Sequence, residues 1–355
     1  MKLIQNISST LKTWVFKNKV FKFSKRYRRD PQACFYCPEM CRFSCPTAET
    51  LRTNAITPRG KMSLLHLTER GYSDENVAGD SVSRQWFLEQ CTGCGRCTEY
   101  CVHEVDVASN LREERNKFWQ AQNRSGLEGS FQGLLRSLEV LSGRVLFCEP
   151  GRASWWNKNA RLLKDLQVDQ AVEVDFPHRE WGWGKLQSEK LAEIGKALKK
   201  CELIYLESPE VGWFFAKGLK ADGKALSAEV RLVWPQFFKL MVGAPLPPGF
   251  VFHESFHLTR LLPRLGYSIP MYERGQMPFH SGWNVLDCGG EGFYRHAHLE
   301  TAKKMATRFL GDLGKDGRKI DKIVCQSLAC VEHLRQETSL PVVYWLDEVV
   351  DGRQR

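Results

Sequence analysis

The sequence predicts a multidomain α+β protein in which a helical, cysteine-rich domain precedes a duplicated α/β unit. Three observations lead to this fold class. Two runs of four cysteines lie within the first 101 of the 355 residues. Beyond residue 143, short apolar runs alternate with helical segments, which is typical of α/β units with a largely parallel sheet. Two landmarks of this second part recur after 106 residues, which indicates an internal repeat.

Residues 1–30 form a basic arm. They hold nine of the 51 Lys and Arg residues but only one of the 41 acidic residues, and the chain carries a formal charge of +10. Apolar residues of the arm recur at helical spacing: Ile4, Ile7, Leu11, Trp14 and Val15. An amphipathic segment that ends in a basic tract can lie on an anionic membrane face or on an acidic partner. The alternative is a solvated leader that packs on its own domain.

The compartment follows from what the chain lacks. No run of about 18 apolar residues could span a bilayer, and the first thirty residues do not have the pattern of a secretory signal. We therefore expect a cytoplasmic protein, in which the 13 cysteines are free thiols, metal ligands or redox centres rather than disulfides. No nucleic-acid partner is expected, because no nucleic-acid module accompanies the basic residues.

Residues 31–122 are expected to form the helical domain. Pro58 and Gly71 mark the start and end of a helix, and "SRQWFLEQ" predicts a second helix before Cys91. Charged, helical sequence continues to about residue 122. The segment "NRSGLEGS" then reads as a linker, so residues 123–142 are assigned to a linker and a connecting helix.

The second part is divided into two α/β repeats, over residues 143–245 and 246–355. Its expected strands are 144–148, 171–175, 202–207 and 230–234 in the first repeat, and 250–254, 322–326 and 341–346 in the second. A long amphipathic helix is expected over 293–311. The recurring landmarks are "RVLFC" with "FVFHE", and "WGWG" with "DCGG".

The cysteine runs read C-x2-C-x3-C-x3-C-P and C-x2-C-x2-C-x3-C. Both are close to the bacterial ferredoxin run that binds [4Fe–4S] clusters, in which the fourth cysteine of each run ligates the other cluster. We therefore assign Cys34, Cys37, Cys41 and Cys101 to one cluster, and Cys91, Cys94, Cys97 and Cys45 to the other. Glycines in "CTGCGRC" let backbone N–H groups approach the sulfurs. Two zinc sites of four thiolates, or buried free thiols, are the alternatives.

With these motifs the chain resembles a known group over residues 31 to about 350. The cysteine runs around "TPRGK" resemble an α-helical ferredoxin domain. The remainder resembles the CCG domains of heterodisulfide reductase-related proteins, including iron–sulfur subunits of glycolate oxidase and anaerobic glycerol-3-phosphate dehydrogenase. In that family the cysteines near "HDPCH", "CCG" and a late C-x-x-C can hold a further iron–sulfur centre. Here Phe256, Asp287 and Ser327 stand at three of those cysteine positions. The first repeat retains only Cys148 and Cys201.

The second repeat keeps enough donors for a third site. Cys288, Cys325 and Cys330, with Asp287, His253 or His257, could form an incomplete metal or redox centre. We favour a retained scaffold, because a site that has lost half its soft ligands loses most of its preference for iron.

The resemblance implies an iron–sulfur electron-transfer subunit. It would pass electrons through two [4Fe–4S] clusters between a flavoprotein (FAD-containing) dehydrogenase and a quinone or other acceptor. No catalytic residue is assigned, since the chain contains no P-loop, nucleophile elbow, H-E-x-x-H or complete Rossmann fingerprint. The alternatives are a self-contained reductase centred on the second repeat and a non-redox assembly protein that binds zinc.

Overall fold

The computed structural model describes residues 31–71, 84–174, 192–212, 228–237, 249–256 and 287–354, apart from residues 36, 38, 102, 104, 123, 235, 292, 293, 314, 316 and 318. Helices and parallel strands are mixed in this part of the chain, so the predicted α+β class is confirmed. The basic arm lies outside the described residues, as does His257. Among the described residues, no helix has both the length and the apolar character needed to cross a membrane.

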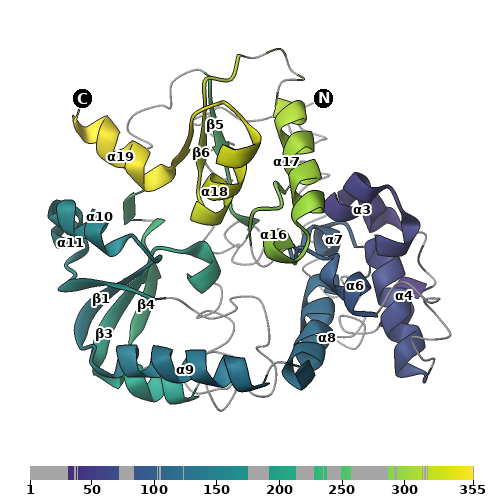
Figure 1. The fold of residues 1–355 in the computed structure, drawn as a ribbon, viewed down its shortest axis with the longest axis horizontal. Helices are drawn as coiled ribbons and strands as arrows, with labels where there is room; N and C mark the ends of the chain where they lie inside the picture. Colours follow the sequence, from purple (N-terminus) through teal and green to yellow (C-terminus); the bar gives the residue numbers. More distant parts are fainter. Residues whose placement is uncertain are drawn as a thin grey trace, which may run out of the picture.

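The cysteine-rich domain is built from short helices (Figure 1). In chain order they are α2 (Pro31–Phe35), η2 (Met40–Ser44), α3 (Pro46–Leu51), η3 (Asn54–Ile56), α4 (Pro58–Glu69), α6 (Arg84–Glu89), α7 (Arg96–Glu99) and α8 (Val107–Gln122). The helix predicted from Pro58 is α4. Its N-cap is Thr57, whose hydroxyl accepts a hydrogen bond from the backbone of Gly60 at 3.1 Å. Buried apolar residues and cysteines together form the core of this small domain.

The segment 123–130 was expected to be a linker before a connecting helix, but helix α9 (Arg124–Glu139) already begins at its second residue, so its described residues are helical. Phe131, Leu134, Leu135 and Leu138 are buried in the core of the first sheet. They recur at the spacing of one helix face. Burial of this face outweighs the low helix propensity of the glycines that suggested a linker.

The first sheet has four parallel strands in the order β2-β1-β3-β4. The strands are β1 (Gly143–Cys148), β2 (Gln170–Glu173), β3 (Cys201–Leu206) and β4 (Glu229–Leu232), accompanied by α10 (Ala153–Lys158), α11 (Ala160–Leu166) and η4 (Leu198–Lys200). Each strand overlaps the apolar run from which it was predicted. Cys148 and Cys201 are buried in this core.

The second sheet is also parallel, in the order β5-β6-β7. Its strands are β5 (Phe250–His253), β6 (Lys322–Cys325) and β7 (Val342–Tyr344), with the helices α16 (Tyr294–Ala297), α17 (Leu299–Leu313), α18 (Leu328–Glu337) and α19 (Trp345–Gln354). The long helix expected over 293–311 is divided at His298 into α16 and α17. The last strand ends earlier than expected, because α19 starts at Trp345.

The two sheets share a local hydrogen-bond pattern. The side chain of Glu207, after β3, accepts from the backbone N–H of Glu149 at 3.3 Å, and that of Gln326, after β6, accepts from Ser255 at 2.9 Å. Glu149 and Ser255 are 106 residues apart, the interval of the sequence landmarks. The duplication and its boundaries stay a prediction, which this shared pattern favours.

The second sheet's helices contact the cysteine-rich domain directly. Helix α17 packs against α3 (Figure 1). Arg308 of α17 forms a 3.0 Å ion pair with Glu49 of α3. The two sheets also share one core, in which Trp234 stacks on Phe252 and meets Trp345 edge-on. The cysteine-rich domain is therefore held against the C-terminal part of the chain.

Candidate iron–sulfur site

The first set of cysteines is Cys34, Cys37, Cys41 and Cys101. A turn in which the N–H of Cys37 donates to the carbonyl of Cys34 at 3.2 Å brings the first two close. Burial raises the pKa of Cys41 to about 12, and the charges of Cys101, Cys37 and Cys45 add to the rise. Cys101, which is 60 residues distant in sequence, is therefore an electrostatic neighbour of Cys41.

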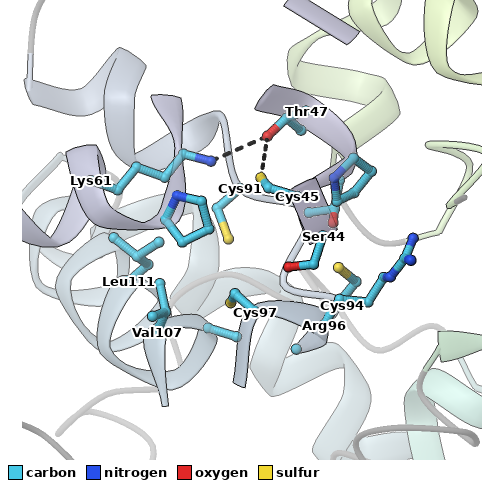
Figure 2. Close-up of a pocket in the computed structure, with 15 residues that line it drawn as sticks. Ser44, Cys45, Thr47, Lys61, Cys91, Cys94, Arg96, Cys97, Val107 and Leu111 are labelled. Carbon is cyan, nitrogen blue, oxygen red and sulfur yellow. Dashed lines mark hydrogen bonds between the residues drawn. The ribbon is translucent and has the colours of Figure 1, made fainter. Parts of the chain in front are cut away.

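The second set is Cys45, Cys91, Cys94 and Cys97. These four residues line one cavity, which encloses about 330 Å³ including its opening to solvent (Figure 2). Cys45 comes from the start of α3, Cys91 and Cys94 from the loop before α7, and Cys97 from α7 itself. Burial raises the pKa of Cys97, as do the charges of Cys91, Cys94, Cys45 and Cys41. The structure thus brings Cys45 to the later run, and the two sets adjoin at Cys41.

Glycines shape the loop of the second set. Gly93 and Gly95 have φ values of 77° and 73°, in the left-handed region that glycine tolerates best. The N–H of Gly93 donates to Cys91 Sγ at 3.4 Å, and the N–H of Val105 donates to Cys101 Sγ at 3.3 Å. Such bonds stabilise thiolates and tune the reduction potential of a bound cluster.

Buried cations surround the second set. Lys61, Arg96, Arg112 and Arg115 are all buried. Lys61 Nζ donates to the carbonyl of Gln90 at 2.6 Å and to Thr47 Oγ1 at 3.2 Å, as Figure 2 shows in part. One guanidinium nitrogen of Arg115 donates to the carbonyl of Cys91 at 2.7 Å. Buried positive charges require nearby negative charge.

The donor set and its surroundings fit a [4Fe–4S] cluster. Four thiolates around an iron–sulfur cube carry net negative charge, which these cations would balance. The sequence offered no signal for the cations, because Lys and Arg within helical segments usually belong to a solvated face.

The C-terminal part covers one side of the second set. The Tyr294 hydroxyl donates to Gln90 Oε1 at 3.2 Å, and Gln90 Nε2 lies 3.0 Å from His298 Nδ1. Thr92, next to Cys91, hydrogen-bonds the side chain of Asp287. Helix α16 and the turn before it therefore form part of the wall around this site.

The donors predicted for a third site are only partly brought together. Cys288 Sγ lies 3.4 Å from Cys330 Sγ and 3.2 Å from His253 Nε2. Cys325 is outside this group of three. It still lies close enough to interact with Cys288, because burial and, second, the charge of Cys288 raise the pKa of Cys325. Asp287 is buried beside the group, and its Oδ1 accepts from the N–H of Gly289 at 2.9 Å.

Comparison with protein families finds a match in the cysteine-rich domain. Residues 30–105 match the family model described as a 4Fe-4S dicluster domain. No curated protein and no solved structure matches the chain. The matched residues contain all eight cysteines of the two sets. Residues 30–105 therefore form a 4Fe-4S dicluster domain, which supports a ferredoxin-like iron–sulfur protein with at least one [4Fe–4S] cluster and a role in electron transfer.

Proposed function

We propose that this chain is an electron-transfer subunit with two [4Fe–4S] clusters, placed between a flavoprotein dehydrogenase and a quinone or other acceptor. The observation that carries the proposal is the gathering of eight cysteines into two adjoining sets of four within the matched domain. When bound, such clusters accept and release one electron at a time. A relay of this kind joins the two-electron chemistry of a flavin to an acceptor.

The chain's own residues hold and tune the clusters in this proposal. Each set supplies four thiolates, and the charge of Cys45 acts on both Cys41 and Cys97. Neighbouring sets of this kind favour electron transfer inside the domain. The buried Lys61 and the N–H of Gly93 stabilise negative charge at the second set, which favours its reduced form.

The two sets differ in their access to a partner. Cys37, Cys41 and Cys101 of the first set are half-buried. Phe43, two residues after Cys41, and Tyr100, directly before Cys101, are 78% and 43% exposed. The second set is walled by α16 and its preceding turn. We therefore place electron exchange with the flavoprotein at the first set.

The basic arm supplies the proposed membrane contact. Its charge and helical spacing of apolar residues suit an anionic surface, and a protein held on the cytoplasmic face could reach a lipid-soluble quinone. This peripheral contact requires no membrane-spanning segment.

Iron and acid-labile sulfide counts on anaerobically purified full-length protein test the proposal. About eight iron atoms and eight sulfides per chain are expected for two [4Fe–4S] clusters. The Cys34→Ser variant should lose the EPR signal of one reduced cluster, whereas Cys288→Ser should retain both. Zinc without iron would instead favour an assembly protein, and loss of an iron signal in Cys288→Ser would favour the self-contained reductase.

A further inference from the structure

Three buried donors from separate elements converge in the second repeat. His253 ends β5, Cys288 lies in the turn before α16, and Cys330 is in α18. Their ligand atoms, one imidazole nitrogen and the two Sγ atoms, all lie within 4.8 Å of one another. All three side chains are buried. This group is distinct from the two sets of cluster ligands.

We infer that His253, Cys288 and Cys330 bind a single zinc ion. Thiolate sulfur and imidazole nitrogen are the donors that zinc prefers, and three protein ligands with a water in the fourth position form a recognised zinc arrangement.

The distances suit one tetrahedral ion. Zinc bonds of about 2.3 Å to sulfur and about 2.0–2.1 Å to nitrogen require S···S and N···S edges of about 3.8 Å and 3.6 Å. The separations are 3.4 Å between the two sulfurs and 3.2 Å between His253 Nε2 and Cys288 Sγ. Each is therefore within about 0.4 Å of the edge that a bound ion requires.

The same residues do not fit the further iron–sulfur centre that the family resemblance implies. In a [4Fe–4S] cluster each protein ligand binds a different iron atom, so the ligands surround the cluster rather than converge on one point. Phe256, Asp287 and Ser327 supply no sulfur at three positions where the family has cysteine. Loss of these donors removes the iron–sulfur centre while leaving a site for one ion.

The charge of the site also favours a cation. The carboxyl group of Asp287, next to Cys288 in sequence, is buried beside the three donors. The carboxyl group of Glu291 is buried close by. A divalent ion would offset this concentration of buried anionic groups.

The backbone of the turn that contains Cys288 allows it to lie close to α18. Gly289 has a φ of 80°, and a Cβ on Gly290 would lie 3.1 Å from Cys330 Cα and 2.9 Å from His333 Cβ. Only a glycine lets the turn approach α18 so closely. That approach places Cys288 beside Cys330. Because Asp287 of the same turn bonds Thr92, zinc at this site would also fix the wall of the second cluster set.

Metal analysis of the full-length protein, made in medium with iron and zinc, tests the inference. We expect one zinc per chain in addition to the iron. X-ray absorption at the zinc edge should show two sulfurs at about 2.3 Å and nitrogen or oxygen at about 2.0–2.1 Å. Cys330→Ser should lose the zinc and keep its iron. The matched control is Cys325→Ser, which removes a buried cysteine outside the group and should keep both metals.

Loss of zinc in Cys330→Ser could also result from misfolding, so a second variant exchanges one zinc ligand for another. His253→Cys preserves three donors, so it should retain one zinc and show a third sulfur in the absorption spectrum. Zinc-free wild-type protein, a disulfide between Cys288 and Cys330 in its place, or zinc with four sulfurs would overturn the inference. Each of these outcomes leaves the iron count unchanged, so a failure here is distinguishable from a failure of the electron-transfer proposal.

Discussion

Replacing Lys61 by glutamine should lower the reduction potential of the cluster at the second set. The Lys61 side chain is 1% exposed. Its Nζ reaches Cys45 Sγ through Thr47 Oγ1, by two contacts of 3.2 Å each. The ammonium group therefore lies within about 6.4 Å of a ligand sulfur. A positive charge so placed stabilises the reduced, more negative cluster, and glutamine removes that charge while retaining a hydrogen-bond donor.

The size of the effect follows from this separation. The added electron resides on the cluster beyond the ligand sulfur, so the charge is taken to lie about 8 Å from it. At an effective dielectric constant of about 20, a unit charge at this distance contributes about 2 kcal/mol. For a one-electron couple, in which 59 mV corresponds to 1.4 kcal/mol, this is a shift of about 90 mV to more negative potential.

An EPR-monitored redox titration measures the shift. Lys303→Gln is the matched control, because Lys303 lies on the exposed face of α17 and its charge is screened by solvent. The control should move neither potential by more than about 20 mV, given this screening. If Lys61→Gln kept its full iron content and an unchanged potential, the cluster would not lie in the cavity beside Lys61, and the reasoning would be refuted.

Three further predictions concern other parts of the molecule. Cys101→Ser should alter the EPR signal of the cluster held by Cys34, Cys37 and Cys41, and damage to the other signal instead would disprove the crossed ligation. Deletion of residues 2–29 should release the protein from membrane fractions without changing its iron content, and unaltered fractionation would disprove the docking role. Burial raises the pKa of Glu207 from 4.5 to about 7. Between these two pH values the folded chain binds more protons than the unfolded chain, so the free energy of unfolding falls as pH rises. Glu207→Gln should remove about 2 kcal/mol of the fall between pH 5.5 and 8, and urea unfolding that shows the same fall in both proteins would contradict this.

The strands and the best-marked helices could be predicted from local sequence. Each strand overlaps its predicted apolar run, and α4 begins at the predicted Pro58. These elements carry their signals within a few residues. The start of α9 was missed for the opposite reason, since it depends on burial of Phe131 and Leu138 against a sheet that forms later in the chain.

The spacing of the cysteines by itself predicted iron–sulfur binding in the first third of the chain, because ligand type and short loops limit which group can bind, and the match to a 4Fe-4S dicluster domain supports at least one [4Fe–4S] cluster there. The tertiary structure alone decided which cations are buried beside those cysteines. It also decided that His253, Cys288 and Cys330 meet while Cys325 remains outside their group. Such contacts join residues that are far apart in sequence, and their geometry is set by the packing of separate helices and strands rather than by any local pattern.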